Sequence, residues 1–464
     1  MNSRILCLAV LAAGLLAAPL SSQVYVDLPL GSWANDVTPD GKTVLGTWPG
    51  GRGFIWNWQD DPAPTIVDNG DIVAVSDDGT VVAGNAFDAS VGTTVASIWT
   101  AATGWQSLDW LPGAPCGTSY STAYDISGDG TTVVGLGWAG CGARGFRWTQ
   151  ATGMQELQNL GNGTNRCSAI SGDGSTMGGF AQGSFSRTPA YWDATTAGFM
   201  IDFNGLGEVY GFNEDGSVSV GTYDFGGNHY GAYVRDEASG AMTNLGSLNN
   251  NWGGNATDIS EDGSVVVGYD VNGLSRQAWI WTSSDGIRSV NQRVLDAGLG
   301  DIDSAFVCRA VSDDGNVVVG GGLDGGGGPF GFGGFIFAMS DPTLYSVGGG
   351  TSGAAGAPWL VADGDLTAGS TLTLDLTDAP ASTPMLLWLS LSSTPLNKFG
   401  GTIHALPVAL ELLLSSDPGG ANSLSATWPA GVPSGAEMWF QYLTKDVSSS
   451  FDITLSNAVK ATAP

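Results

Sequence analysis

Short apolar runs of three to five residues, separated by Gly, Asp, Asn and Ser, recur along most of the chain. Runs of this length, bounded by turn-forming residues, are typical of β-strands rather than helices. The clearest example is 258–268, where Asp-Ile-Ser-Glu-Asp-Gly is followed by Ser-Val-Val-Val-Gly. An Asp-Gly pair readily supplies the positive φ that a tight hairpin needs. This segment therefore predicts two antiparallel strands joined by a tight turn.

The same phrase recurs, with variations, seven times. The Asp of its Asp-Gly pair lies at positions 40, 78, 129, 173, 215, 262 and 314, so the period varies between 38 and 52 residues. Each repeat continues with an aromatic strand, such as 146–148 or 279–281, and a short fourth strand, such as 154–157 or 242–245. Four strands per repeat at this period are typical of propeller blades. The pattern predicts an all-β chain with a seven-bladed β-propeller over residues 24–348.

The two ends of the propeller compete for one position. Residues 24–28 and residues 344–347 both resemble the fourth strand of a repeat, and one of them is surplus. Pairing of the N-terminal strand into the seventh blade would close the ring and remove an exposed sheet edge. We therefore expect residues 24–28 to close the propeller.

The chain after residue 348 follows a different pattern. Residues 349–356 form a Gly-, Ala- and Ser-rich linker, and no further repeat follows. Short apolar strands then alternate with Pro, Gly and Asp turns, at 366–376, 385–391, 408–414, 437–443 and 451–455. Segments of this kind predict a small antiparallel β-sandwich domain over 357–464.

The net charge and the N-terminal segment limit the possible partners and the cellular location of the protein. Asp and Glu outnumber Lys and Arg by 44 to 15, a net charge of −29, which argues against nucleic acid or an anionic membrane surface as a partner. Residues 1–23 carry Arg4, an apolar run and then small polar residues, which is typical of a signal peptide and too short for a membrane span. We expect an exported monomer, secreted or at the cell surface, with no membrane insertion.

Export makes the later cysteines candidates for disulfides. Cys116 precedes the third blade, and Cys141 lies in the loop between that blade's second and third strands. Both positions fall on one face of a propeller, here called the upper face, and predict a Cys116–Cys141 disulfide. Cys167 and Cys308 occupy the same position in two distant repeats, so we expect both to be unpaired and buried.

The repeat motifs taken together resemble the HAF-type extracellular repeat family. Segments 231–233, 242–246 and 265–268 correspond to that family's His-Ala-Phe-x-Trp, Gly-Met-x-Asp-Leu-Gly and Val-Val-Gly strands. The His is absent from every repeat; residues 144–148 and 277–281 stand in its place. The C-terminal part resembles a module of exported planctomycete-type bacterial proteins. The resemblance implies a secreted repeat protein, and the family has no firmly assigned activity.

Metal binding is the sharpest candidate chemistry. Three repeats carry Asp-x-Ser/Thr-x-Asp-Gly, a spacing of hard oxygens that fits the start of a Ca²⁺ loop. Against this, the other four repeats lack the first Asp, and no Glu follows to complete a loop. We expect structural turns, with Ca²⁺ as the alternative and no other cofactor. The Asp residues concerned are Asp36, Asp40, Asp125, Asp129, Asp258 and Asp262.

An enzyme has little support in the sequence. The two histidines, His229 and His404, lie in different predicted domains, and no nucleophile elbow, metal-spaced His pair or phosphate loop is present. Carboxylate pairs can support glycoside hydrolysis, but 44 acidic residues make such pairs uninformative. We expect a protein that is not an enzyme.

A binding function is better supported, because aromatic residues follow the Val-Val-Gly strands where propeller loops reach the upper face. Aromatic faces with nearby polar groups suit stacking on sugar rings; the alternative is that these rings pack between neighbouring blades. The aromatic residues are Trp48, Phe87, Trp138, Phe180, Tyr223 and Tyr269. Their polar companions are Asp88, Arg187, Asp224, His229, Asp270 and Arg276.

These observations predict a secreted, non-enzymatic propeller with an appended β-sandwich, which binds an extracellular glycan or protein through its upper face. A glycan-acting hydrolase or lyase is the runner-up, and it would need acidic residues that converge on the channel mouth. A structural cell-surface component is the third alternative.

Overall fold

The computed structural model describes residues 23–112, 120–161, 163–182, 187–201, 205–226, 230–249, 252–297, 299, 305–323, 332–339, 344–353, 356–364 and 366–463. The chain forms two compact units. One contains residues 23–58 and 63–339, and the other contains residues 59–62 together with 340–464. The predicted signal peptide lies outside the described residues except for Gln23.

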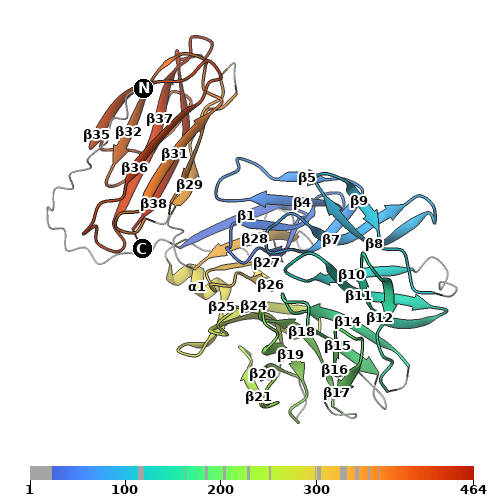
Figure 1. Cartoon of the computed structure of the whole chain (residues 1–464). Coiled ribbons are helices and arrows are strands. Elements are labelled where there is room, and N and C mark those ends of the chain that lie inside the picture. The colour runs from blue at the N-terminus through green and yellow to red at the C-terminus, as the bar shows by residue number, and fades with distance from the viewer. Residues whose placement is uncertain are drawn as a thin grey trace. The chain divides into compact units, whose positions relative to one another are not determined.

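The first unit consists of seven antiparallel four-stranded sheets, which confirms the seven-bladed propeller (Figure 1). The first strands are β2 (Trp33–Val37), β6 (Gly70–Val75), β10 (Ser121–Ile126), β14 (Asn165–Ile170), β18 (Gly207–Phe212), β22 (Gly253–Ile259) and β26 (Ala305–Val311). The second strands are β3 (Thr43–Trp48), β7 (Val82–Asp88), β11 (Thr132–Ala139), β15 (Thr176–Gln182), β19 (Val218–Tyr223), β23 (Val265–Asn272) and β27 (Val317–Leu323).

The aromatic third strands and the short fourth strands complete each blade. The third strands are β4 (Arg52–Asn57), β8 (Thr93–Thr100), β12 (Gly142–Thr149), β16 (Arg187–Asp193), β20 (Gly231–Asp236), β24 (Ser275–Thr282) and β28 (Phe332–Ala338). The fourth strands of blades one to six are β5 (Thr65–Val67), β9 (Gly104–Ser107), β13 (Gly153–Glu156), β17 (Gly198–Met200), β21 (Met242–Gly246) and β25 (Gly286–Ser289).

The N-terminal strand β1 (Val24–Leu30) supplies the fourth strand of blade seven. It pairs with β28, with Val24 opposite Ala338 and Val26 opposite Ile336. The ring of Tyr25 stacks on that of Phe335 with centroids 5.8 Å apart. The predicted closure of the ring is therefore confirmed.

The Asp-Gly turns are hairpins, as predicted. In blade six, Gly263 has a φ of 71°, and the Asp262 carboxylate accepts hydrogen bonds from the Ser260 hydroxyl and the Ser264 backbone N–H. The first and second strands that flank this turn pair in register, with Ile259 opposite Val266. The turn thus joins an inner strand to its neighbour at the lower end of the blade.

One short helix, α1 (Val290–Asp296), is present among the described residues, and it connects blade six to blade seven. The Ser289 hydroxyl caps it by accepting a hydrogen bond from the Gln292 N–H. In the part of the chain that the structure describes, no helix has the length and apolar character of a membrane span.

The second unit contains the remaining strands. They are β29 (Leu344–Gly348), β30 (Trp359–Asp363), β31 (Thr371–Thr377), β32 (Pro384–Ser390), β33 (Leu396–Lys398), β34 (Gly401–Ile403), β35 (Leu410–Ser415), β36 (Asn422–Thr427), β37 (Glu437–Lys445) and β38 (Ile453–Thr462). The five-stranded sheet β29-β38-β37-β32-β35 and the three-stranded sheet β30-β31-β36 share one core, in which Leu372, Leu374 and Leu376 pack with Leu387 and Phe440. Two sheets around one core form a sandwich.

The predicted boundary at residue 348 is wrong. Strand β29, which reads as a fourth propeller strand in the sequence, pairs with β38 of the sandwich, with Leu344 opposite Ala461. Because β1 already occupies the edge of blade seven, β29 has no partner left in the propeller. The propeller ends at Met339, and the sandwich begins before the predicted 349–356 linker.

Candidate functional site

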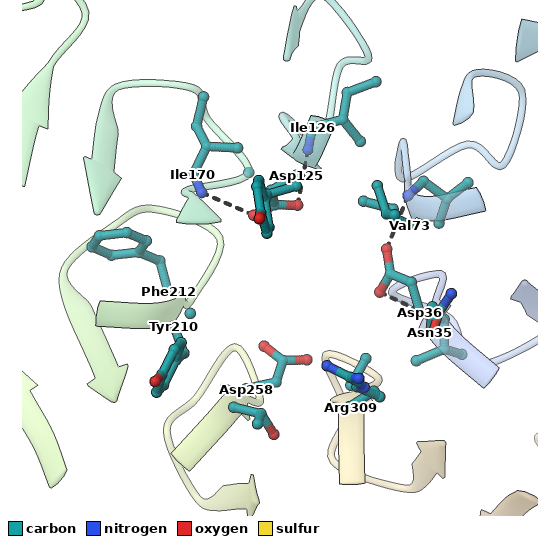
Figure 2. A pocket seen from close by; sticks show the side chains of 18 of the residues that line it. Asn35, Asp36, Val73, Asp125, Ile126, Ile170, Tyr210, Phe212, Asp258 and Arg309 are labelled. Atoms are coloured by element: carbon teal, nitrogen blue, oxygen red, sulfur yellow. Dashed lines mark hydrogen bonds between the residues drawn. The ribbon is translucent and has the colours of Figure 1, made fainter. Parts of the chain in front are cut away.

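The first strands of all seven blades surround a channel with a volume of about 490 Å³ (Figure 2). Its lower end is formed by the Asp-Gly turns, and its upper end lies toward the loops between second and third strands. Every first strand contributes side chains to the wall. The channel is thus the place where residues from distant repeats meet.

A β-bulge in every first strand sets which side chain faces the channel. The pairing of each first strand with its second strand slips by one residue at the same position, as between Ala123 and Asp125 or between Cys308 and Ala310. A bulge leaves one residue unpaired and re-aims its side chain. All seven of these unpaired residues line the channel: Asn35, Val73, Tyr124, Ser168, Tyr210, Thr257 and Arg309.

The glycine of each Val-Val-Gly motif lies opposite the bulge. A Cβ atom at Gly135 would lie 2.1 Å from the carbonyl oxygen of Thr122, and one at Gly268 would lie 2.1 Å from that of Asn255. The equivalent glycines of the other five blades meet a first-strand carbonyl at 2.0–2.1 Å: Gly46, Gly84, Gly179, Gly221 and Gly320. The motif glycine is therefore required for the close approach of two backbones.

Three Asp side chains from blades one, three and six connect neighbouring blades within the channel wall. Asp125 accepts the N–H of Ile126 in its own strand and the N–H of Ile170 in the next blade, at 2.8 and 2.9 Å. Asp36 bonds Val37 and Val75 in the same way, and Asp258 bonds Ile259 and Val311; Figure 2 shows the three on different strands. Burial raises the pKa of Asp125 and Asp258 to about 7 and that of Asp36 well above its usual value.

The six aspartates considered for Ca²⁺ separate into two structural roles. The first Asp of each pair bonds two blades together, and the second Asp accepts hydrogen bonds within its own turn, as Asp40 does from the Thr38 hydroxyl and the Lys42 N–H. Asp129 and Asp262 bind their turns in the same manner. No group of three or more His, Cys, Asp or Glu residues that could hold a metal is found among the described residues. The residues do not converge as a Ca²⁺ loop requires.

The lower end of the channel is acidic and its turns are bonded to one another. The carboxylates of Asp77, Glu214, Glu261 and Asp313 gather there, and burial together with neighbouring carboxylates raises the pKa of Glu214 to about 7 and that of Asp313 to about 6. Six of the seven junctions between neighbouring turns carry a hydrogen bond from a backbone N–H: Asp77 to Gly128, Gly128 to Gly172, Asp173 to Glu214, Glu214 to Glu261, Glu261 to Asp313 and Asp313 to Pro39.

The upper end has the opposite character. Four arginines and three tyrosines from blades three to seven form what we call the arginine–tyrosine cluster: Arg166, Arg187, Arg276, Arg309, Tyr124, Tyr210 and Tyr269. The Arg166 guanidinium lies 4.9 Å from the centre of the Tyr124 ring, and the Arg276 guanidinium lies 5.8 Å from that of Tyr269. Tyr269 and Arg276 in turn interact electrostatically with Arg309. Tyr210 interacts electrostatically with Tyr269, Arg166 and Arg187, and so joins the two groups.

Two arginines of the cluster share one carboxylate. Arg166 Nη2 lies 2.5 Å from Glu208 Oε1, and Arg187 Nη1 lies 3.6 Å from Glu208 Oε2. The Glu208 side chain is only 2% exposed. Both guanidinium groups also lie over the ring of Phe180, at 5.2 and 4.4 Å from its centre. The charges of these two arginines are therefore paired with Glu208.

Arg309 differs from them because, among the described residues, no carboxylate lies within ion-pairing distance of its guanidinium. Its side chain is enclosed by the channel wall, yet its surface is open to the channel. It lies 5.8 Å from the centre of the Trp33 ring. Burial lowers the pKa of Arg309, although an arginine stays charged in proteins. A cation in this position leaves room for an anionic partner.

The six predicted aromatic residues do not form one line. Relative to the motif glycine, Phe180 and Tyr269 come one residue later, Trp48 and Tyr223 two, and Phe87 and Trp138 three. Since side chains alternate between the faces of a strand, the residues at offsets one and three point to one face and those at offset two to the other. Trp48 packs edge-on against Phe54, Tyr223 packs against Phe225, and Phe87 is 59% exposed.

The polar residues predicted beside these rings also lie in different places. Arg187 and Arg276 belong to the arginine–tyrosine cluster, whereas Asp270 is fully buried and accepts the Trp279 indole N–H. Asp88 and Asp224 accept hydrogen bonds from Ser90 and Gly226 in their own loops. His229 lies outside the described residues. Of the predicted residues, the structure therefore brings Phe180, Arg187, Tyr269 and Arg276 to one place.

Of the cysteines, only Cys116 and Cys141 are predicted to lie on the upper face, where they would form a disulfide. Cys116 lies outside the described residues, so the Cys116–Cys141 disulfide stays a prediction. Cys167 and Cys308 are free and buried, and burial raises the pKa of both thiols. They lie in the first strands β14 and β26 and take no part in the arginine–tyrosine cluster.

Sequence reasoning missed Arg166, Arg309, Tyr124 and Tyr210. Each lies in a first strand, at or two residues before the bulge, where the local pattern reads simply as a strand. Tyr124, Tyr210 and Arg309 share the position just before the one that holds the first Asp of the motif, or its replacement, and the residue there varies from repeat to repeat; Arg166 lies two residues earlier in its own repeat. Alignment of the seven repeats on their Asp-Gly pairs would have singled out the bulge residues, though not the bulge itself.

No protein-family model matches the chain, and no curated protein matches it either. Among solved structures it is similar to TolB from Acinetobacter baumannii, at 15% identity over 56% of this chain and 64% of that one, with a TM-score of 0.36. It is also similar to the propeller domain of the Trilobed protease from Pyrococcus furiosus, at 10% identity over 63% of this chain and 89% of that one, with a TM-score of 0.41.

A chain of the mitotic checkpoint complex is similar at 14% identity over 74% of this chain and 100% of that one, with a TM-score of 0.43. The present chain spans less than two thirds of the Acinetobacter TolB. Likenesses at this level concern the propeller fold alone. The resemblance to HAF-type repeats rests on the motif residues.

Proposed function

We propose that this chain is an exported, non-enzymatic binding protein of the HAF-repeat type, whose glycan or protein ligand enters the upper end of the propeller channel. The observation that supports this best is the arginine–tyrosine cluster at the mouth of a 490 Å³ channel. A concave site of this size, lined by rings and a few convergent polar groups, fits a small ligand or the end of a chain.

The predicted aromatic residues outside the channel, such as Trp138 and Phe87, define a second placement for the ligand on the outer loops. The two placements differ in which rings a ligand would touch. A glycan array with the full exported chain tests them together, with the variants Tyr124→Ala for the channel and Trp138→Ala for the outer loops, with and without Ca²⁺.

We expect saturable binding that Tyr124→Ala reduces at least tenfold and that Trp138→Ala leaves within about twofold, since stacking on one ring contributes roughly 1.5 kcal/mol. Loss with Trp138→Ala alone would move the site to the outer loops. Absence of binding to every glycan would reject the glycan ligand and leave a protein partner or a structural cell-surface role.

A hydrolase is the second candidate, because three carboxylates with raised pKa values line the same channel: Asp36, Asp125 and Asp258. A catalytic acid at neutral pH needs such a pKa. However, both oxygens of each carboxylate accept a backbone N–H, so all three serve the wall of the channel. Release of reducing ends from an array hit, abolished by Asp125→Asn, would favour the hydrolase.

A further inference from the structure

We propose that the ligand of the upper channel mouth is a carboxylate-bearing saccharide, such as a uronic acid oligomer, whose carboxylate pairs with Arg309. This inference rests on the proposed function and adds the chemical class of the ligand. It also assigns Arg309 and its neighbours Trp33 and Tyr269 as the residues that recognise the acidic sugar.

Positive charge is concentrated at the mouth of the channel. The whole chain carries only 15 Lys and Arg residues against 44 acidic ones, yet four of those 15 gather at the channel mouth. Glu208 is the carboxylate that forms ion pairs within the cluster, and it binds Arg166 and Arg187. The mouth therefore carries an excess of positive charge in a protein whose surface repels anions elsewhere.

Arg309 faces the channel without a carboxylate partner among the described residues. Its planar guanidinium presents donors in a fork that matches a carboxylate in two parallel hydrogen bonds. The bulge in β26 turns this side chain into the channel, and no carboxylate of the described residues pairs with it. Arg309 is exposed to the channel, so its guanidinium is accessible to an anion that enters from the upper mouth. An anionic ligand would supply that partner.

The neighbouring groups favour a saccharide over an acidic peptide. The Arg309 guanidinium lies 5.8 Å from the centre of the Trp33 ring and interacts electrostatically with Tyr269, and aromatic rings beside a cation suit the C–H faces of a sugar. The channel wall adds the neutral hydroxyl groups of Tyr124 and Tyr210, which suit sugar hydroxyls. A folded protein surface cannot enter a channel of 490 Å³.

The lower half of the channel limits how deep the acidic group can go. Asp36, Asp125 and Asp258 form a layer of carboxyl groups below the bulge, and Asp77, Glu214 and Asp313 follow at the lower end. A carboxylate pushed toward them meets further carboxyl groups, and acidic groups that share one site disfavour an additional negative charge. The ligand is thus oriented with its carboxylate at Arg309 and its neutral part elsewhere in the mouth.

The test uses the full exported chain and calorimetric titration with trimers of galacturonate, glucuronate and mannuronate. Each acid is compared with its methyl ester and with the neutral trimer of the matching hexose; triglutamate serves as the acidic peptide. We expect at least one uronate trimer to bind about tenfold to a hundredfold more tightly than its ester, because a charge-assisted pair is lost on esterification. Triglutamate is expected to bind more weakly than that trimer.

Three variants locate the contact. Arg309→Gln is expected to remove the preference for acid over ester, whereas Arg288→Gln, which removes an arginine from the outer strand β25, leaves it within twofold. Arg309→Lys keeps the charge without the fork and is expected to fall between them. If Arg309→Gln fails to fold, the acid-to-ester comparison on the native chain still decides.

The outcomes separate the two proposals. Equal binding of acid, ester and neutral trimers, or tighter binding of triglutamate, overturns the uronate inference and leaves a glycan or peptide site in place. A preference for acid that survives Arg309→Gln in a folded protein overturns the assignment of Arg309. Failure of every trimer here, together with an empty glycan array, rejects the proposed glycan binding itself.

Discussion

At the scale of single residues, each repeat contains two glycines that have different structural roles. The glycines of the Asp-Gly turns follow from their positive φ, as at Gly263. The glycine that ends Val-Val-Gly is different, since its φ is ordinary and the carbonyl of the first strand occupies the place of a side chain. That carbonyl is brought there by the bulge, which depends on pairing across the hairpin and leaves no mark on the local pattern.

The close approach at Gly268 gives a stability prediction. Gly268→Ala would place a Cβ atom 2.1 Å from the Asn255 carbonyl oxygen, so the bulge must open, and we expect a loss of about 3 kcal/mol in the free energy of unfolding. Gly253→Ala in the same blade is the control, because its nearest neighbour would be Val271 at 3.6 Å. Urea denaturation of both variants measures the difference; equal midpoints would contradict the steric explanation.

At the scale of elements, the Asp-x-Ser/Thr-x-Asp-Gly motif forms hydrogen bonds both within its own turn and to the next blade. Asp-x-Ser/Thr-x-Asp-Gly resembles a Ca²⁺ loop because its oxygens alternate, yet the second Asp bonds within its own turn, whereas the first Asp bonds both its own strand and the next blade. The first Asp bonds a backbone N–H that lies 39, 45 or 53 residues further on, for Asp36, Asp125 and Asp258 respectively. Contacts at that separation are set by the ring of blades, so a pattern within one repeat cannot reveal them.

These junctions predict a dependence of stability on pH. Burial raises the pKa of Asp125 and Asp258 to about 7 in the folded protein, whereas an unfolded Asp titrates at about 3.9. The folded state therefore holds these protons more tightly, and its free energy of unfolding falls as the pH rises from about 4 through 7. We expect urea midpoints measured between pH 4 and pH 8 to fall less steeply in Asp125→Asn than in the native chain.

Asp125→Ala provides the matched comparison. It leaves the N–H groups of Ile126 and Ile170 without their acceptor, and an unsatisfied buried donor costs about 1–3 kcal/mol. The alanine variant should be less stable than the asparagine variant at every pH, because the amide oxygen can still accept one of the two bonds. Parallel pH profiles for the native chain and both variants would show that Asp125 does not titrate in this range.

At the scale of the whole molecule, neighbouring blades are joined by hydrogen bonds that are not the same at every junction. Six junctions between lower turns carry a backbone-donated hydrogen bond, and the seventh begins at Pro39, which has no N–H to donate. That junction is held instead by Asp36 to Val75 and by Asn35 to the Ile72 carbonyl. The number of blades could be predicted from the sequence, because each repeat has its own Asp-Gly motif. The closing strand could not be identified from the pattern alone, because β1 and β29 both resemble the fourth strand of a repeat.

The assignment of β1 as the closing strand gives the last prediction. A chain that begins at Ser32 lacks β1, so blade seven keeps three strands, the Phe335 ring loses Tyr25, and the edge of β28 is exposed. We expect the melting temperature of the propeller to fall by roughly 5–10 °C, as a loss of a few kcal/mol does in a domain of this size. Addition of a peptide with the sequence of residues 23–31 should restore part of the loss, since it can pair with β28 as β1 does. An unchanged melting temperature would mean that β26, β27 and β28 hold the ring closed without a fourth strand, and that the N-terminal strand adds nothing to the stability of blade seven.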